Sequence, residues 1–336
     1  VLEPFLRKAP PDQVRHVLRL GAAGLLLLET PPHAAVATAV ALTRARGLTP
    51  FAGLVNAVLR KVAAAGPAAM DGLDAPRLDT PPWLWTSWGA DARAIATAHQ
   101  HEAPLDLTLS GHEDPPPGGI ALPTGSWRYP PGTRVADLPG FAEGHFWVQD
   151  AAAALPARLL DVQPGERVAD LCAAPGGKTA QLALTGAQVT AVERDTTRLV
   201  RLRQNLTRLH LSADTIASDA TAWRPAQPLD AVLLDAPCSA TGTIRRHPEV
   251  AHLRRPRDIT AMAETQDKLL AAAAAMLRPG GRLVYAVCSL QPEEGPARIA
   301  AALTHLPLRP LPILPDEAFL PQALTPQGHL RTTPAL

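Results

Sequence analysis

The chain has 336 residues, of which 46% are hydrophobic and 19% are charged, so it is too apolar for intrinsic disorder and long enough for two or three domains. Its 32 basic and 31 acidic residues leave a net charge of +1, and a polyanionic partner would therefore need a local basic patch. Aromatic residues amount to 4%, which argues against a base-stacking sheet.

The three cysteines of the chain, Cys172, Cys238 and Cys288, are odd in number and widely spaced. They exclude a disulfide scaffold and a CxxC zinc pair, and they favour the reducing cytoplasm. No apolar run approaches the roughly 20 residues of a membrane span, so no membrane is expected as a partner. The first residues lack the pattern of a signal peptide, and the start at Val1 rather than Met is consistent with a fragment.

Residues 1–65 are predicted to form a small all-α module. From Val14 to Val62, leucines and valines recur at steps of three and four residues, the period of an amphipathic helix. Pro31-Pro32 and the stretch from Gly47 to Pro50 divide this region into separate helices.

The rest of the chain is predicted to contain a small α+β linker domain over residues 66–145 and an α/β domain over 146–336. The first is rich in Pro and Gly, whereas in the second β-type runs alternate with helical segments, which indicates a doubly wound parallel sheet. We expect the strand order 3-2-1-4-5, and a helix stop and turn at Arg278–Gly281. The predicted strands are Arg167–Leu171, Gln188–Val192, Asp214–Ala217, Asp230–Leu234 and Arg282–Val287, and the predicted helices are Thr179–Leu184, Thr196–Leu209 and Ala263–Leu277.

The first strand of this sheet leads into a Gly-rich turn, which is the predicted cofactor site. In such a turn, glycines allow the backbone to approach a ligand. A phosphate loop would need glycine at position 172, and the GxGxxG dinucleotide fingerprint is absent. S-adenosylmethionine is the other common occupant of this position. The turn reads Cys172, Ala173, Ala174, Pro175, Gly176, Gly177, Lys178.

Three acidic residues follow successive strands and complete the predicted cofactor cleft. Glu193, after the second strand, is expected to bind the ribose, and Asp219, after the third, to reach the adenine amino group. Asp235 closes the fourth strand. Glu193 and Asp219, each taken alone, are equally consistent with a cap of a helix or turn, but three acids after three successive strands favour a ligand cleft.

Cys238 comes shortly after the fourth strand and Cys288 directly after the fifth, and these strands should be neighbours about 4.8 Å apart. Both thiols are therefore expected at the edge of the sheet where such folds bind ligands. Without further ligands to complete a metal site, they indicate nucleophilic chemistry rather than zinc, and no metal is expected. For Cys172 the simpler interpretation is a small core residue.

A thiolate beside S-adenosylmethionine has a specific use in the methylation of pyrimidines. When it adds to carbon 6 of cytosine or uracil, carbon 5 becomes nucleophilic enough to attack the methyl sulfonium. The carbon 5 proton must then be removed and the thiolate expelled, which requires a base and a group that contacts the ring. Asp235 is the candidate for contact with ring N3 and the amino edge.

Two groups of basic residues follow these motifs. The group after Cys238 is suited to RNA phosphate contacts, the alternative being a solvated helix face. It consists of Arg245, Arg246, His247, Arg254 and Arg255. The other group is expected to be the exposed face of the helix after the second strand, and it consists of Arg194, Arg198, Arg201, Arg203 and Arg208.

Three segments of the chain resemble the RNA cytosine-5 methyltransferases of the Sun/Fmu type, most closely the bacterial RsmB-type 16S rRNA subgroup. They are Asp170–Thr179, Leu234–Gly242 continued through Arg245–Pro248, and Tyr285–Glu294. The N-terminal segments also resemble the NusB-like RNA-binding module of this subgroup, and they are Leu18–Gly21, Pro32–Val36 and Gly53–Arg60. The resemblance spans nearly the whole chain and is weakest in the middle domain.

The resemblance implies a Rossmann-like S-adenosylmethionine methyltransferase that modifies carbon 5 of a cytosine in 16S rRNA or in a small-subunit precursor. It implies that Cys288 is the nucleophile and that Cys238 helps to release the product. It also implies cofactor contacts from Glu193, Asp219, Asp235 and the turn Cys172–Lys178. We expect the protein to act as a monomer.

Four departures from the family pattern bear on this interpretation. Val287 stands where the family usually has Thr before the nucleophile, and Glu193 replaces a commoner Asp. The NusB-like module is expected to lack its first helices. The chain ends at Leu336, before the usual final Asp-Gly-Phe-Phe strand, and an incomplete sheet edge is expected.

Two other hypotheses remain open. A catalytically impaired RNA-binding or ribosome-assembly factor would bind RNA in a salt-sensitive way without methyl transfer. An S-adenosylmethionine enzyme that modifies another base position, or a protein, would not need a thiolate.

Overall fold

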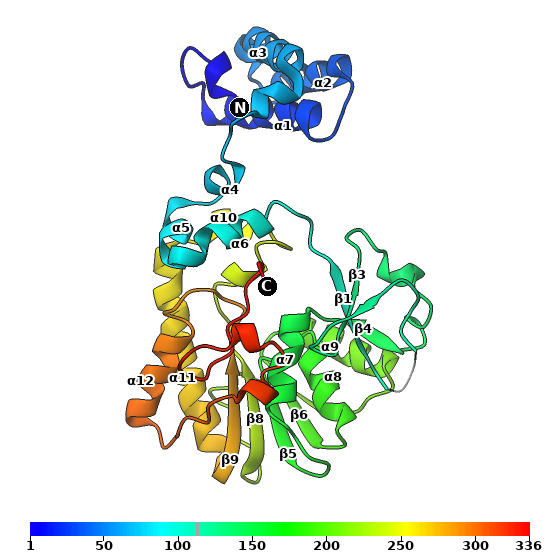
Figure 1. Cartoon of the computed structure of the whole chain (residues 1–336), viewed down its shortest axis with the longest axis vertical. Helices are drawn as coiled ribbons and strands as arrows, with labels where there is room; N and C mark the ends of the chain where they lie inside the picture. The colour runs from blue at the N-terminus through cyan, green and yellow to red at the C-terminus, as the bar shows by residue number, and fades with distance from the viewer. Residues whose placement is uncertain (112–113) are drawn as a thin grey trace. The chain divides into compact units, whose positions relative to one another are not determined.

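The computed structural model describes residues 1–111 and 114–336, and the chain divides into two compact units, Val1–Ala75 and Pro76–Leu336 (Figure 1). Each unit has a hydrophobic core of its own. The three-domain division with boundaries after residues 65 and 145 stays a prediction. Among the described residues, no helix is both long and apolar enough to cross a membrane.

Within residues 1–75, all of which the structure describes, three α-helices form a bundle. They are α1 (Asp12–Leu26), α2 (Pro32–Ala45) and α3 (Ala52–Ala65), with 3-10 turns at Glu3–Phe5, Thr49–Phe51 and Gly66–Met70. Their apolar faces meet in a core in which Leu18, Val55 and Leu59 are fully buried. Gly21 lies so close to Leu59 that a side chain there would overlap with it. The predicted helical module is confirmed, including its breaks at residues 31–32 and 47–50.

The second unit begins with short helices and a small antiparallel sheet. Its first elements are α4 (Ala75–Leu78), α5 (Pro82–Trp88), α6 (Ala92–Ala98), β1 (Leu105–Leu109), β2 (Ile120–Ala121), β3 (Trp127–Tyr129) and β4 (Phe146–Val148). The strands lie in the order β2-β3-β1-β4. Leu84 and Ile95 pack against Ile244 and Leu290, which follow the two predicted catalytic cysteines in the chain. The early helices therefore lie against the segments that carry these cysteines.

A buried ion pair stabilises this small sheet. The Asp106 carboxylate is fully buried and accepts hydrogen bonds from Arg128 Nε at 2.8 Å, Arg128 Nη2 at 2.9 Å and Ala151 N at 3.1 Å. We expect Asp106→Ala to lower the free energy of unfolding by about 3 kcal/mol, because it leaves several donors without an acceptor. Urea unfolding measures this loss. The exposed Asp137→Ala serves as control, with a change within about 0.5 kcal/mol, and equal losses in the two variants would contradict the prediction.

A parallel sheet of five strands forms the centre of the second unit. Its strands are β5 (Arg167–Leu171), β6 (Gln188–Glu193), β7 (Asp214–Ala217), β8 (Leu229–Asp235) and β9 (Leu277–Ala286). They lie in the order β7-β6-β5-β8-β9, which confirms the predicted order and the doubly wound α/β fold. The turn predicted at Arg278–Gly281 does not form a separate turn before the last strand. These residues lie within β9 at a bulge, because Leu229 pairs with Leu277 while Ala231 already pairs with Arg282.

Helices cover both faces of this sheet (Figure 1). On one face, Leu270 and Met276 pack against Val232 and Leu234, whereas the alternate residues of β8 face the other layer. Such burial on both faces is typical of parallel sheets. The first layer contains α11 (Pro256–Met276) and α12 (Pro296–His305), and the second contains α7 (Ala151–Leu159), α8 (Gly177–Leu184) and α9 (Thr196–Arg208). The remaining short elements are α10 (Val250–Leu253) and 3-10 turns at Gly89–Asp91, Val135–Asp137, Thr241–Thr243, Pro315–Glu317 and Pro321–Ala323.

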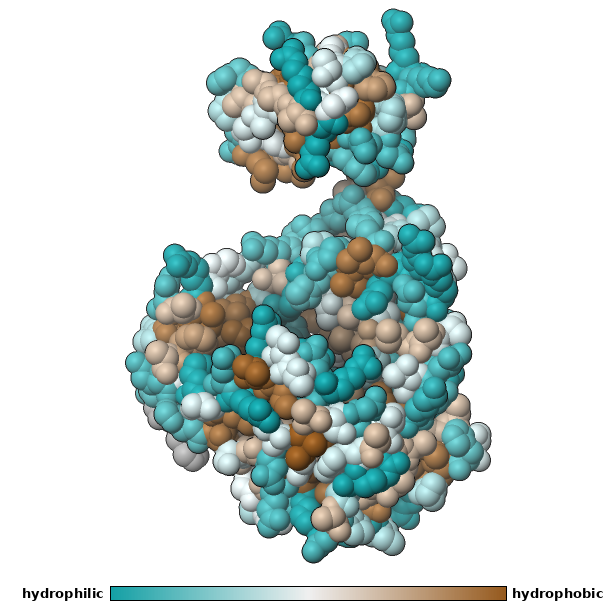
Figure 2. Space-filling view, turned by 180° about the vertical axis from the view of Figure 1, so that it is seen from behind, coloured by the Kyte–Doolittle hydropathy of each residue, from teal (hydrophilic) through white to brown (hydrophobic). Residues whose placement is uncertain are grey.

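α11 begins at Pro256, earlier than the predicted start at Ala263. Proline is favoured in the first turn of a helix, and the Asp258 carboxylate accepts a hydrogen bond from Arg255 N at 2.9 Å. On the face of the molecule shown in Figure 2, hydrophobic residues occur in small, separate groups among hydrophilic ones.

Candidate active site

The two cysteines predicted to act in catalysis lie side by side beyond the ends of β8 and β9. Their Sγ atoms are 3.4 Å apart, and Cys288 is exposed whereas Cys238 is half-buried. Backbone hydrogen bonds join the two segments, from Ala236 N to Ala286 O and from Gly242 N to Cys288 O, both at 2.9 Å. Backbone contacts between the two segments therefore continue past the ends of β8 and β9 and bring the sulfurs together.

The two thiols differ in acidity because they share a hydrogen bond. This hydrogen bond lowers the pKa of Cys288, and Lys178 lowers it further against the opposing effects of partial desolvation and of the Asp235 charge. The same hydrogen bond, together with burial, raises the pKa of Cys238 well above that of an ordinary thiol. Cys288 is therefore the member of the pair that ionises first, and the thiolate is the nucleophilic form.

Cys172 lies in a different setting. Its side chain packs against the hydrophobic cluster between the sheet and α11. Burial, with a contribution from Glu193, raises the pKa of Cys172 to about 12. Its thiol is suited to packing rather than to nucleophilic attack, as the simpler interpretation of the sequence expected.

A largely buried ion pair lies at the same end of the sheet. Lys178 Nζ, from the first turn of α8, is 2.8 Å from Oδ2 of Asp235, the last residue of β8. Burial lowers the pKa of Lys178, but the charge of Asp235 and its hydrogen bond reverse this effect and leave a net increase. The lysine therefore stays an ammonium ion and favours the thiolate of Cys288.

We expect Lys178→Met to raise the pKa of Cys288, because it removes a positive charge and leaves the Asp235 carboxylate unpaired. The rate of Cys288 alkylation by iodoacetamide, followed by mass spectrometry against pH, should shift its midpoint upward by about one pH unit. Lys268→Met on α11, at an exposed position, is the matched control and should leave the midpoint unchanged. An unchanged midpoint in Lys178→Met would contradict the assigned role of the lysine.

The predicted cofactor turn connects β5 to α8. Gly176 has a φ of +101°, and a Cβ there would come within 2.9 Å of Leu202 on α9, so this position requires glycine for both reasons. Asn205 Nδ2 donates to Pro175 O at 2.8 Å and fixes the turn from the side of α9. α8 begins at Gly177, which leaves the first N–H groups of the helix free of intrahelical partners at the turn.

Glu193 ends β6 with its side chain only 3% exposed. Its carboxylate accepts hydrogen bonds from Ala174 N at 3.3 Å and Asp195 N at 3.0 Å, and Arg198 Nη1 lies 3.3 Å away. The carboxylate thus holds the predicted cofactor turn in place, as a capping acid would. A ribose that bound to Glu193 would contact the same carboxylate as Arg198.

Asp219 is exposed after β7, and its Oδ1 accepts hydrogen bonds from the N and Oγ1 atoms of Thr221, at 2.8 and 2.6 Å. These hydrogen bonds lower the pKa of Asp219. This acid therefore shapes a turn and remains a carboxylate that a ligand donor can approach.

Asp170 is a buried acid of the site that our sequence reasoning did not select. Its Oδ2 accepts a hydrogen bond from Thr179 Oγ1 at 2.6 Å, whereas Oδ1 has no partner among the described residues. Burial raises the pKa of Asp170 to about 7. An acidic residue between the apolar residues of a buried strand was the available signal. An unsatisfied acceptor, a left-handed glycine turn and two strand-end carboxylates fit a polar cofactor such as S-adenosylmethionine.

Of the five residues predicted to contact RNA, three bind other parts of the protein and two are exposed. Arg245 donates to His101 O and Glu102 O, both at 3.1 Å. Arg246 donates to the Asp150 carboxylate and to Pro104 O, and Arg254 to Ser239 O. These three guanidinium groups hold neighbouring segments in place. His247 and Arg255 are exposed.

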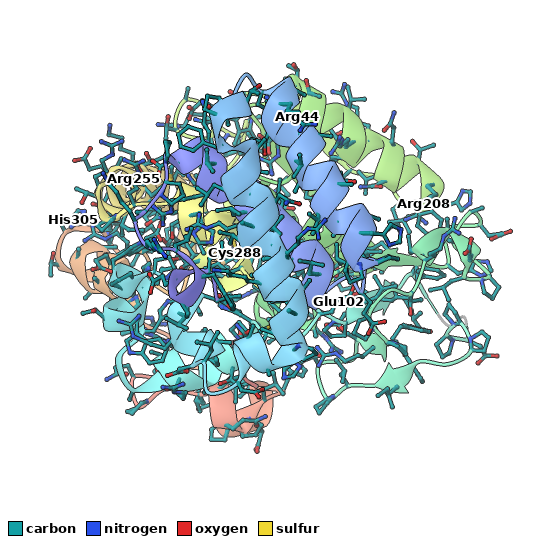
Figure 3. The ribbon with its side chains drawn as sticks, turned by 90° about the horizontal axis from the view of Figure 1, so that it is seen from above. Arg44, Glu102, Arg208, Arg255, Cys288 and His305 are labelled. Carbon is teal, nitrogen blue, oxygen red and sulfur yellow. The ribbon has the colours of Figure 1, made fainter. Side chains whose placement is uncertain are left out.

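The arginines near α9 were expected to form an exposed face, and this is wrong for Arg208. Its guanidinium is half-buried, donates to Phe141 O and Phe146 O, and lies 4.3 Å from the centre of the Phe141 ring. Arg198 also points toward the site, with contacts to Glu193 and Ala174 O. In Figure 3, Arg208 and Arg255 lie on opposite sides of Cys288, so the two basic groups are separate.

The model of the family described as 16S rRNA methyltransferase RsmB/F matches residues 157–335, more than half of the chain. The chain belongs to the RsmB/F family of 16S rRNA methyltransferases. The NusB family model matches residues 2–64, the helical unit. The resemblance seen in the sequence is therefore confirmed at both ends of the chain.

Curated relatives and solved structures agree with this assignment. Ribosomal RNA small subunit methyltransferase B of Sodalis glossinidius is 38% identical over 331 residues, covering 91% of this chain and 76% of the relative. The protein of the same name from Vibrio cholerae is 39% identical over 326 residues, covering 88% and 74%. The crystal structure of a methyltransferase homologue from Pyrococcus horikoshii is 29% identical, with a TM-score of 0.56 and coverage of 75% and 85%.

The crystal structure of PH0851 has the same fold, with a TM-score of 0.78 over 96% of this chain and 79% of its own, at 24% identity. These comparisons confirm the predictions of an rRNA methyltransferase that uses S-adenosylmethionine. The roles of the individual site residues stay predictions.

Proposed function

We propose that this protein methylates carbon 5 of a cytosine in 16S rRNA through a covalent bond between Cys288 and carbon 6 of the base. The observation that carries the proposal is the pair of sulfurs 3.4 Å apart, with the Lys178–Asp235 ion pair at the same end of the sheet. Methylation of an exocyclic amine or a ribose hydroxyl needs no such thiol pair.

The reaction begins with the Cys288 thiolate, which adds to carbon 6 and moves electron density to carbon 5. Asp235 contacts ring N3 and the amino edge, and Lys178 holds its carboxylate in place. When bound, S-adenosylmethionine would supply the electrophilic methyl group for carbon 5, and its bond from sulfur to the methyl carbon would break to leave a neutral thioether. A base then removes the carbon 5 proton, the bond from carbon 6 to the Cys288 sulfur breaks, and the ring double bond is restored.

Cys238 acts in the release of the product. Its sulfur lies within hydrogen-bond distance of the sulfur whose bond to carbon 6 must break, so it can exchange a proton with the departing thiolate. The cofactor would be held by Glu193, Asp219, Asp235 and the turn Cys172–Lys178, with Asp170 as a further acceptor beneath the turn.

RNA phosphates would contact the exposed His247 and Arg255 after Cys238. Arg245, Arg246 and Arg254 serve this surface indirectly, because their donors hold the surrounding segments. We propose that the substrate is free 16S rRNA or a small-subunit precursor and that the protein acts as a monomer in the cytoplasm.

Nucleoside analysis tests this proposal directly. The protein is incubated with undermethylated 16S rRNA and tritiated S-adenosylmethionine, and the digested RNA should contain its label in 5-methylcytidine. RNA that carries 5-fluorocytidine should become covalently attached to the protein, because fluorine at carbon 5 cannot leave as a proton. Label in any other nucleoside, with no attachment to the fluorinated RNA, would overturn the proposal.

A further inference from the structure

A buried polar cluster lies directly behind the cysteine pair. It joins the segments after β8 and β9 to α11, and in the described residues it centres on the carboxylate of Glu294. Glu294, Ser239, Thr241 and Gln266 are each 0% exposed. Burial of a carboxylate is unfavourable unless donors satisfy its oxygens. A satisfied network of this kind is rigid, so the hydroxyl and amide partners are held in a defined geometry. The members of the cluster are Ser239, Thr241, Gln266, Ser289 and Glu294.

Both carboxylate oxygens of Glu294 accept hydrogen bonds. Oε1 accepts from Ser239 N at 2.8 Å and from Gln266 Nε2 at 3.2 Å. Oε2 accepts from Ser239 Oγ and, at 2.5 Å, from Ser289 Oγ. One side chain therefore binds both serines.

These two serines are the residues that immediately follow the cysteines. Ser239 follows Cys238, and Ser289 follows Cys288. Gly242 strengthens the junction, since its N–H donates to Cys288 O and a Cβ at this position would come within 2.8 Å of that oxygen. Glu294 therefore contacts the residue next to each cysteine of the pair.

We propose that Glu294 is a positioning residue that binds Ser239 and Ser289 and thereby sets the separation of the Cys238 and Cys288 sulfurs. Glu294 does not touch the substrate in this assignment. Its consequence for catalysis rests on the proposed cytosine-5 chemistry, because a wider separation would weaken the hydrogen bond between the thiols and slow the release of the adduct.

Disulfide trapping measures the separation without RNA. Diamide takes two electrons and two protons from the thiols and joins Cys238 to Cys288, and peptide mapping by mass spectrometry gives the rate. In Glu294→Gln an amide donor replaces one acceptor oxygen, so the side chain can no longer accept from both the serine hydroxyls and the donors at Oε1. We expect trapping about tenfold slower than in the unchanged protein. The matched control is Glu293→Gln, at the exposed neighbouring residue, which should trap at the unchanged rate.

Ser289→Ala provides a second variant if Glu294→Gln does not fold, because it retains both contacts at Oε1. It too should slow trapping, and with 16S rRNA it should lower kcat while leaving KM for S-adenosylmethionine and the melting temperature nearly unchanged. Trapping at the unchanged rate in a folded Glu294→Gln or Ser289→Ala variant would overturn the proposal. If the unchanged protein forms no RNA adduct but trapping still depends on Glu294, the proposed cytosine chemistry fails and the positioning role stands.

Discussion

Replacing Cys288 with alanine should lower methyl transfer to 16S rRNA about 1,000-fold or more, with little change in the affinity for S-adenosylmethionine. The thiol is the group assigned to the covalent step, and removal of a nucleophile leaves only binding and orientation to act on the substrate. Cys288 lies beyond the end of β9 and is exposed, so the loss of its sulfur leaves the core of the sheet intact. Transfer of tritiated methyl groups measures the rate, and isothermal titration measures cofactor binding.

The control for this experiment is Glu293→Gln, a change at an exposed residue of the same segment, which should keep its activity. The nucleophile assignment fails if Cys288→Ala methylates 16S rRNA at a rate comparable to this control. In that event a thiol-independent reaction, such as methylation of an exocyclic amine, would be favoured.

Replacing Cys238 with alanine should instead cause the covalent protein–RNA adduct to accumulate. The nucleophile remains, but the group assigned to its release is absent, and we expect at least about tenfold more adduct than in the unchanged protein. The hydrogen bond that lowers the pKa of Cys288 is also lost, so the pKa of Cys288 should rise and adduct formation should shift to higher pH. A denaturing gel shows the adduct as a band of reduced mobility that carries labelled RNA.

The double variant Cys238→Ala, Cys288→Ala is the matched control and should show no such band, since it lacks the attacking thiol. A shifted band in the double variant would show attachment through another residue. If the single variant Cys238→Ala turns over without accumulating adduct, the release role belongs elsewhere in the site.

The structure gives an explanation for valine at position 287, where the family usually has threonine. Val287 is half-buried and packs against the cluster between the sheet and α11. The residue before the nucleophile is therefore positioned by hydrophobic contacts in this chain. The segment that follows is fixed instead by polar contacts, through Ser289 and Glu294. The absence of a threonine hydroxyl thus leaves the anchoring of Cys288 intact.

The family, the parallel sheet, its strand order and the Gly-rich turn after its first strand could all be predicted from the sequence. These features depend on local patterns, such as β-type runs, helix periodicity and a Gly-rich turn, and on motifs that stand contiguous in the chain. The adjacency of Cys238 and Cys288 followed from the same reasoning, because neighbouring parallel strands end at one edge of the sheet. Local signals also located the helical unit, where prolines mark the breaks between helices.

Only the tertiary structure decided how the side chains at this edge are partnered. In the sequence, Arg246 and Arg254 look like cations that are free to bind RNA. In the structure, Arg246 donates to the carboxylate of Asp150, which is remote along the chain, and Arg254 donates to Ser239 O across a loop. The roles inferred for Lys178 and Glu294 depend on hydrogen bonds between segments that no sequence period brings together. Burial and partner distance set the charge and position of such groups, and both arise only when distant segments pack.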